Sequence, residues 1–323
     1  MTHVSVVVPT YRRPALLERT LGALASQVRG DWTYDVIVAD DAASEETRQQ
    51  VRRWDGRHGV RINYAPVNGP VHGPAAARNA GWRRATGEWI AFTDDDTVPS
   101  PAWLDDAMRC LTERPCAAGW GAVVVPLPEV PTDYERAAAG LETAGFVTAN
   151  CFVRRDVLER LGGFDTSFAE AWREDSDLYF RLLADGQRVI EVPRAVVVHP
   201  VRPAGWGVSV RQERKTAYDA LLYRKHPALY RRFIHPRRPA DYSVAAVAAA
   251  GTFAGLVAGW TTIAAWSLAA WCLVTGSIAR RRLRGTSRAP AHIAEMLVTS
   301  AVLPIASFYW GIRGAIRYRV LFW

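Results

Sequence analysis

Three adjacent carboxylates, Asp94, Asp95 and Asp96, are the strongest chemical signal in the sequence. Neighbouring carboxylates repel one another unless solvent or a bound cation separates their charges. Hard divalent cations prefer oxygen ligands, and Mg2+ usually binds through one or two carboxylates together with substrate phosphates. An apolar run at 89–93 precedes the cluster, so the sequence predicts a strand that ends in a metal site suited to a diphosphate. The alternative is a solvated acidic turn that caps the helix beginning near Trp103.

A second acidic pair, Asp40 and Asp41, follows another apolar run. We interpret this pair as a further set of ligand contacts, with capping of the helix that starts near Glu45 as the alternative. Arg78 lies in a predicted helix that begins after Gly73. An arginine there suits a phosphate or a base, and an ordinary surface arginine is the alternative.

Glu174 and Asp175 form an acidic pair at the start of another predicted helix. A carboxylate that activates a hydroxyl must stand apart from the metal ligands, and Asp175 meets that condition. The alternative is the negative charge that the first turn of any helix favours. His199 ends a run of valines and is interpreted either as a metal or phosphate contact or as a histidine at the edge of the core.

Apolar runs alternate with helical patterns over roughly the first hundred residues. This alternation predicts a doubly wound parallel α/β sheet. Ligands of such sheets bind beyond the carboxyl ends of the strands, where both acidic groups lie. After Val125 the pattern becomes a mixed strand and helix region. The predicted strands are 4–8, 34–39, 60–65 and 89–93, the predicted helices are 14–27, 45–57 and 74–85, and the mixed region contains elements at 141–154, 157–161 and 175–183.

No charged residue lies between positions 243 and 279. One straight helix of that length would exceed the ~30 Å hydrocarbon core of a membrane, so two helices with a turn near 255–259 are predicted. A third apolar stretch at about 291–312 either spans the membrane or lies in its interface. A buried helical hairpin of a soluble protein is the alternative to the first two helices. Arginines flank the apolar segments, as expected for cytosolic loops, at Arg231, Arg232, Arg237, Arg238 and within 280–284.

The overall charge and the cysteines narrow the class of protein. The net charge is +8 and the pI is near 9.6, which suits nucleic acid, an anionic membrane or phosphate ligands. Many basic residues lie beside the apolar segments without interleaved aromatic residues, so we expect no nucleic-acid partner. The four cysteines form no CxxC pair, which predicts a reducing compartment. The N-terminus has no signal-peptide pattern, so we expect a cytosolic domain at 1–235 and membrane-anchoring helices at 236–323.

Several nucleotide-binding and hydrolase motifs are missing from the sequence. It contains no GxGxxG after the first predicted strand, no GxxxxGK[ST] and no GxSxG. These absences argue against a dinucleotide oxidoreductase, a P-loop NTPase and a hydrolase with a serine nucleophile elbow.

Five segments in order resemble the family-2 glycosyltransferases, whose nucleotide-sugar-binding domain has the A-type fold. The likeness extends from Val4 to about His199, roughly two thirds of the chain. Ala42 and Ala43 depart from the usual VDDGS pattern. The resemblance implies a GT-A-like mixed, mostly parallel sheet flanked by helices, followed here by C-terminal transmembrane helices. The matching segments are VSVVVPTY (4–11), VIVADDAAS (36–44), GPAAARNAG (73–81), AFTDDD (91–96) and GGFDTSFAEAWREDSDLYFR (162–181).

The resemblance also implies roles for individual residues. Asp175 would be the general base that takes a proton from the acceptor hydroxyl, and the sugar would transfer by single displacement with inversion. Asp94 and Asp96 would hold Mn2+ or Mg2+, which neutralises the diphosphate leaving group. Contacts with the nucleotide-sugar donor would come from Pro9, Tyr11, Asp40, Asp41, Arg78, Asp94, Asp95, Glu174 and His199.

One departure from the family pattern limits the kind of reaction that we expect. Processive relatives carry a QxxRW motif, but the Arg-Trp pair is missing after Gln212. We therefore expect addition of a single sugar to a lipid-linked or cell-envelope glycan, by a multi-pass protein of the cell inner membrane whose catalytic domain faces the cytoplasm. The alternatives are a non-catalytic nucleotide-binding membrane scaffold, a polyprenyl-phosphate sugar transferase, and a nucleotidyltransferase, whose usual glycine-rich first loop is absent.

Overall fold

The computed structural model describes residues 1–234 and 239–321, which form two compact units. The predicted domain boundary between positions 235 and 236 lies outside the described residues, as do Arg237 and Arg238. That boundary therefore stays a prediction. Unit 1 contains residues 1–126 and 139–201, and unit 2 contains residues 127–138 and 202–321.

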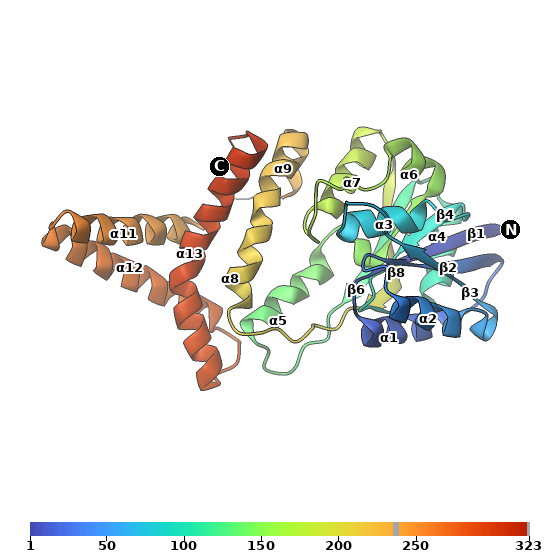
Figure 1. The fold of residues 1–323 in the computed structure, drawn as a ribbon, viewed down its shortest axis with the longest axis horizontal. Coiled ribbons are helices and arrows are strands. Elements are labelled where there is room, and N and C mark those ends of the chain that lie inside the picture. The colour runs from blue at the N-terminus through green and yellow to red at the C-terminus, as the bar shows by residue number, and fades with distance from the viewer. Residues whose placement is uncertain (235–238, 322–323) are drawn as a thin grey trace. The chain divides into compact units, whose positions relative to one another are not determined.

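A mixed sheet of eight strands, counted over the described residues, forms the centre of unit 1 (Figure 1). The β1–β2, β2–β3, β1–β4 and β6–β8 pairs are parallel, whereas β4–β7, β6–β7 and β5–β8 are antiparallel. The predicted fold class, a mixed and mostly parallel α/β sheet flanked by helices, is confirmed. In sheet order the strands are β3 (Arg61–Pro66), β2 (Trp32–Asp40), β1 (Thr2–Thr10), β4 (Trp89–Phe92), β7 (Cys151–Arg154), β6 (Ala118–Val124), β8 (Val189–Val198) and β5 (Val98–Pro99).

The side chains of β1 alternate between two cores, because successive residues of a strand point to opposite faces. Val6 and Val8 pack with Leu21 of α1 (Pro14–Ala25), whereas Val7 packs with Ile37 and the alanines of α3 (Pro74–Trp82). Both faces of the sheet are covered, so its central strands carry apolar side chains on both faces. Figure 1 shows α1 and α2 (Glu45–Trp54) on one face and α3, α6 (Arg155–Leu161) and α7 (Glu174–Ala184) on the other.

The helices of unit 1 begin where local signals place them. Pro14 and Pro74 occupy the first turns of α1 and α3, and the Ser44 hydroxyl accepts a hydrogen bond from the Thr47 N–H at the start of α2. Helix α2 ends before Gly56, whose φ of +78° is left-handed, so it is shorter than predicted. The helices are α1 (Pro14–Ala25), α2 (Glu45–Trp54), α3 (Pro74–Trp82), α4 (Trp103–Glu113), α6 (Arg155–Leu161) and α7 (Glu174–Ala184), with short 3-10 turns η1 (Arg57–Gly59), η2 (Ala139–Thr143) and η3 (Thr148–Asn150).

All the regular secondary structure among the described residues of unit 2 is helical. Helices α11 (Ala240–Val257) and α12 (Thr261–Arg282) form an antiparallel hairpin (Figure 1). The chain turns at Gly259, and the two helices are close at Gly255, where an added Cβ would lie 2.9 Å from the backbone nitrogen of Ala264. The outer faces of the pair are apolar and exposed. The helices are α5 (Asp133–Ala138), α8 (Val208–Gln212), η4 (Glu213–Thr216), α9 (Ala217–Lys225), α10 (Pro227–Phe233), α11 (Ala240–Val257), α12 (Thr261–Arg282) and α13 (Pro290–Tyr318).

Three helices among the described residues are long and apolar enough to cross a membrane: α11, α12 and α13. Within unit 2, α13 differs from the other two because it runs steeply across the end of the hairpin (Figure 1). One face of α13 packs on α9, where a Cβ at Gly314 would come within 2.6 Å of the Ala217 carbonyl oxygen. Its other face, which includes Val298, Val302 and Ile305, is exposed and apolar.

Candidate active site

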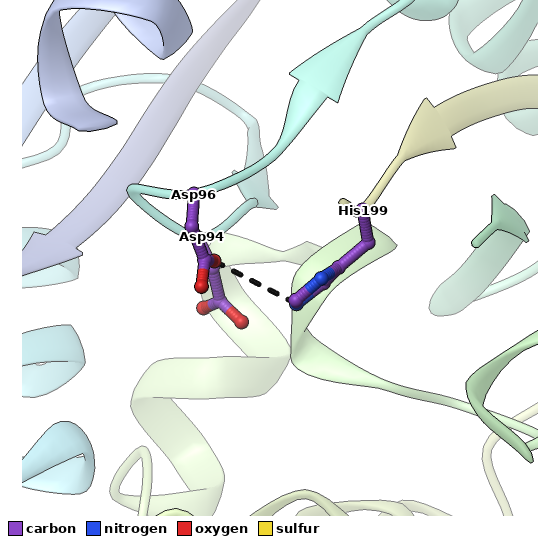
Figure 2. A group of neighbouring side chains, drawn as sticks. All are labelled: Asp94, Asp96 and His199. Carbon is purple, nitrogen blue, oxygen red and sulfur yellow. Dashed lines mark ion pairs between the residues drawn. The ribbon is translucent and has the colours of Figure 1, made fainter. Parts of the chain in front are cut away.

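Asp94, Asp96 and His199 converge at the carboxyl edge of the sheet in unit 1 (Figure 2). Potential ligand atoms of the three side chains all lie within 4.8 Å of one another, and His199 Nε2 is 3.6 Å from Asp96 Oδ1. The two aspartates follow β4, and the histidine follows β8. Two carboxylate oxygens and one imidazole nitrogen form a donor set that suits Mn2+, and the oxygens also suit Mg2+.

The strand pairing explains why His199 reaches the acidic loop. The short strand β5 begins two residues after Asp96 and pairs antiparallel with β8, with Val98 opposite Val198. His199 directly follows the last residue of β8, and its N–H donates to the Val124 carbonyl of β6 at 2.8 Å. The turn itself is closed by the Thr97 hydroxyl, which donates to the Asp94 carbonyl at 2.7 Å. The turn that carries Asp94 and Asp96 is therefore fixed next to His199 by the β5–β8 pairing and by the Thr97 hydrogen bond.

Asp95 points away from this cluster and joins two loops. Its carboxylate accepts a hydrogen bond from the Thr10 hydroxyl at 2.7 Å and pairs with Arg13 at 3.2 Å. The side chain is only 2 % exposed, and this burial raises the pKa of Asp95 to about 6, an effect that Arg13 opposes. Asp95 therefore fastens the acidic loop to the turn after β1.

Arg78 connects the acidic loop to the start of α7. Its guanidinium donates to Asp94 and to Glu174, each at 2.9 Å. Burial disfavours its charge, but the two carboxylates outweigh that effect and raise the pKa of Arg78 above its ordinary value. Arg78 Nε is buried without a hydrogen-bond partner among the described residues. One buried cation is thus shared between a candidate metal ligand and the acidic pair at 174–175.

Asp175 is more accessible than its neighbour Glu174, which Arg78 holds. Its Oδ1 accepts hydrogen bonds from the Ser176 N–H at 2.6 Å and the Ser176 hydroxyl at 3.2 Å. Loss of solvation raises the pKa of Asp175, an effect that the Ser176 N–H and Arg173 oppose. The charges of Arg78, Asp175 and Asp94 all act on the buried Cys151 thiol, so the acidic pair belongs to the same neighbourhood as the acidic loop. A carboxylate with a raised pKa accepts a proton more readily than an ordinary aspartate does.

The residues after β1 and β2 form the other end of the site. Asp41 accepts a hydrogen bond from the Gly73 N–H at 3.0 Å and lies 3.1 Å from His72 Nδ1. Asp40 is fully buried, and its carboxylate accepts from the backbone N–H of Ala42 and Ser44 and from the Tyr64 hydroxyl. Asp40 therefore shapes the loop that presents Asp41.

Pro9 and Tyr11 differ in exposure. Pro9 is buried in β1 beside Ala39 of β2, whereas the Tyr11 ring, just beyond the strand, is 49 % exposed. Of these two residues, Tyr11 is the one whose side chain is open to a ligand.

Two supporting residues were not expected from the sequence. The Asn150 side chain donates to the carbonyls of Ala122 and Ala195, each at 2.8 Å, and accepts from Trp103 Nε1. It thereby ties β6, β8 and α4 together behind His199. A lone asparagine carries no sequence signal for this role. The second supporting residue is His72, which lies beside Asp41 and directly precedes the 73–81 segment identified from the sequence.

The sequence profiles and relatives that match this chain are glycosyltransferases or polysaccharide biosynthesis proteins. A sequence profile described as Glycosyl transferase family 2 matches residues 5–162, and one described as Glycosyl transferase family group 2 matches residues 89–279. The chain is 31% identical over 210 residues to the succinoglycan biosynthesis protein ExoM of Rhizobium meliloti, covering 62% of this chain and 67% of that protein.

A second relative is longer than this chain. The chain is 28% identical over 272 residues to a validoxylamine A glucosyltransferase of Streptomyces hygroscopicus subsp. limoneus, covering 70% of this chain but only 57% of that protein. Among solved structures, a mannosyltransferase from Pyrobaculum calidifontis in complex with GDP-Man and Mn2+ is similar with a TM-score of 0.56 at 22% identity, over 98% of this chain and 86% of that one. At this identity the structural likeness establishes the fold alone.

Proposed function

Because the chain belongs to glycosyl transferase family 2, we propose that it moves a single sugar from a nucleotide-sugar to a hydroxyl of a glycan or lipid-linked acceptor. The family membership confirms the resemblance predicted from the motifs. The observation that carries the proposal is the convergence of Asp94, Asp96 and His199 beside the Arg78 bridge to Glu174.

The acidic cluster and Arg78 are proposed to receive the donor diphosphate. Asp94, Asp96 and His199 would hold Mn2+ or Mg2+, which as a Lewis acid would neutralise charge on the leaving group. Arg78 supports this role because its carboxylate partners leave Nε without a hydrogen-bond partner among the described residues. Its planar guanidinium suits a phosphate better than a lysine would.

Asp175 is proposed as the general base of an inverting transfer. Its carboxylate would take the proton of the acceptor hydroxyl while that oxygen bonds to the anomeric carbon and the bond from this carbon to the donor phosphate oxygen breaks. The nucleoside diphosphate then leaves with the electron pair of that bond. The raised pKa of Asp175 supports the assignment, because a base works best when its pKa approaches the operating pH.

The far end of the site is proposed to select the nucleotide. Asp41 would contact the base, and the exposed Tyr11 ring would lie against the nucleoside. Asp40 and Asp95 would act by holding the two loops, since their carboxylates already have protein partners. Pro9 and Glu174 would likewise support their neighbours, because both are buried.

The apolar helices support a membrane location. We propose that the α11–α12 hairpin spans the cell inner membrane, with unit 1 in the cytoplasm, because arginines lie at the open end of the hairpin. A lipid-linked or cell-envelope glycan would then be the acceptor.

Metal-dependent donor binding tests the proposal directly. Full-length protein in detergent is screened with UDP-, GDP- and dTDP-sugars, with and without Mn2+, and its thermal unfolding is followed. We expect one donor class to stabilise the protein only with metal, by about 2.7 kcal/mol at a hundredfold excess over Kd. Asp96→Ala should abolish this stabilisation, whereas the matched control Asp106→Ala on α4 should keep it.

Turnover separates the alternatives. We expect release of nucleoside diphosphate by the natural chain and a large loss in Asp96→Ala and in Asp175→Asn. Full turnover in both variants would overturn the assignment of the site. Donor binding without turnover across the whole panel would indicate a scaffold, and release of pyrophosphate would indicate a nucleotidyltransferase.

A further inference from the structure

A cavity of about 490 Å³ lies in unit 2 between the end of α12 and the early turns of α13. Its lining combines two kinds of side chain. Three residues are arginines, and the other four have small or apolar side chains. The lining residues are Gly276, Ala279, Arg280, Leu283, Arg284, Arg288 and Leu297.

The basic run that borders this cavity divides into two groups. Arg281 pairs with Asp241 at 2.6 Å, and the buried Arg282 pairs with Asp133 at 2.9 Å. The side chains of Arg280, Arg284 and Arg288 are exposed and have no carboxylate partner among the described residues. The two arginines that the fold neutralises are therefore distinct from the three that line the cavity.

The negative end of the α12 dipole, which lies beside the cavity, is partly neutralised by an arginine. The end of a helix carries a partial negative charge on its free carbonyls, which would repel a phosphate. Arg136 donates to the carbonyls of Arg282 and Arg284 and so offsets that charge at the end of α12. Among the described residues, no Asp or Glu lines the cavity.

The apolar part of the lining continues onto the hairpin. Leu283 and Ala279 are buried, Leu297 is half exposed, and Gly276 lies one turn further into the apolar length of α12. Basic pockets between membrane helices on the cytoplasmic side suit the headgroups of anionic lipids. A ligand with a phosphate at one end and a hydrocarbon chain at the other satisfies both halves of this lining.

We propose that this cavity binds an anionic phospholipid of the membrane, with its phosphate held by Arg280, Arg284 and Arg288 and its chain along Gly276 and Leu297. The lipid is a resident ligand and not a sugar acceptor, because the cavity offers no carboxylate that could activate a hydroxyl. The inference requires only that the α11–α12 hairpin lies in a membrane, so it stands apart from the proposed transfer reaction.

Lipid binding by the delipidated full-length protein tests the proposal. Phosphatidylglycerol or phosphatidylcholine is added in detergent, and retained lipid is measured by native mass spectrometry together with thermal unfolding. We expect a retained phosphatidylglycerol, little retained phosphatidylcholine, and no stabilisation by inorganic phosphate. Equal retention of the two lipids, or stabilisation by phosphate alone, would overturn the proposal.

Two variants that lose the same charge distinguish binding in the cavity from general electrostatic attraction of the protein to an anionic lipid. The triple variant Arg280→Gln, Arg284→Gln, Arg288→Gln should weaken phosphatidylglycerol binding by about a hundredfold, at roughly a factor of five for each arginine near the surface. The control triple Arg313→Gln, Arg317→Gln, Arg319→Gln removes the same charge from the other end of α13 and should bind almost as the natural chain does. An equal loss in both triples contradicts a specific site.

A cavity-filling variant tests the chain half without altering charge. A Cβ at Gly276 would meet no atom within 4 Å, and Gly276 lines the cavity, so we expect the side chain of Gly276→Leu to occupy part of it. It should reduce phosphatidylglycerol retention at least tenfold, whereas Ser277→Leu, on an exposed neighbour outside the lining, should not. Unchanged retention in Gly276→Leu would overturn the proposed position of the lipid chain.

Discussion

Arg78 in unit 1 and Arg282 in unit 2 are both buried arginines, at 3 % and 8 % exposure, yet their surroundings differ in kind. Arg282 donates from all three nitrogens, to Asp133, Thr299, Ser300 and Ser209. The Nε atom of Arg78 has no hydrogen-bond partner among the described residues. One of the two carboxylates that Arg78 binds, Asp94, belongs to the candidate metal cluster. A fully partnered buried charge joins helices, whereas a partly partnered one still has a donor to offer to a ligand.

Substitution of Arg282 should have the largest effect on stability. Arg282→Met removes the nearer cation of the partly buried Asp133 carboxylate, which then keeps, among the described residues, only Arg136 at 3.4 Å. Breaking a buried pair costs about 3–5 kcal/mol, and we expect a loss toward the lower end of that range because Arg136 remains. We expect a lower unfolding temperature but an undiminished rise in that temperature when donor and Mn2+ are added. Loss of the donor response in Arg282→Met would remove the distinction between the two arginines.

Substitution of Arg78 should affect both stability and ligand binding. Arg78→Met leaves Asp94 and Glu174 facing each other without a cation, so the fold is expected to weaken. The donor-dependent stabilisation of about 2.7 kcal/mol, defined at a hundredfold excess of donor over Kd, should also disappear. Calorimetry with and without donor separates the two effects, and a full donor response would show that Arg78 is purely structural.

The pH dependence of turnover sharpens the role of the acidic pair. The base must be ionised to act, so kcat should fall tenfold for each pH unit below the pKa of Asp175. Because burial raises that pKa, the fall should begin above the ordinary aspartate pKa of about 3.9. The sign for stability is opposite. The native state takes up this proton more readily than the unfolded chain does, so its contribution to the free energy of unfolding grows as pH falls through the raised pKa.

Asp175→Asn separates catalysis from stability within that prediction. The neutral amide should lower kcat by about 10²–10⁴-fold without lowering the unfolding temperature at neutral pH. The control Asp185→Asn at the exposed end of α7 should change kcat little. A large fall in the unfolding temperature of Asp175→Asn would instead indicate that the carboxylate supports the fold.

The smallest expected effect concerns the loop that presents Asp41. Ala43 has a φ of +49°, a left-handed conformation that costs an L-residue roughly 1–2 kcal/mol. Ala43→Gly should therefore raise the free energy of unfolding by about 0.5 kcal/mol after the greater entropy of unfolded glycine is subtracted. Ala42→Gly lacks this strain and should lower it, as thermal unfolding of the two variants can show.

The sheet, and the acidic residues at its carboxyl edge that form the candidate metal cluster, were predictable because their signals are local. Valine-rich runs mark the buried strands, and the rule that ligands bind beyond strand ends brought Asp41 and Asp94 to one edge. The Arg78–Glu174 pair joins residues 96 positions apart, and no local pattern encodes such a distance. The sideways turn of Asp95 toward Arg13 likewise depends on the packing of the loop after β1 against the acidic loop.

Helix α5 has a practical consequence for dissecting the molecule. Its segment, 127–138, interrupts the sequence of unit 1 but contacts the end of α12, through Asp133 to Arg282 and through the Pro131 carbonyl to the Ser287 N–H. The polypeptide therefore passes between the units three times, after positions 126, 138 and 201. A soluble fragment truncated after 201 would carry an orphaned insert, so a clean excision of unit 1 needs a designed linker in place of 127–138.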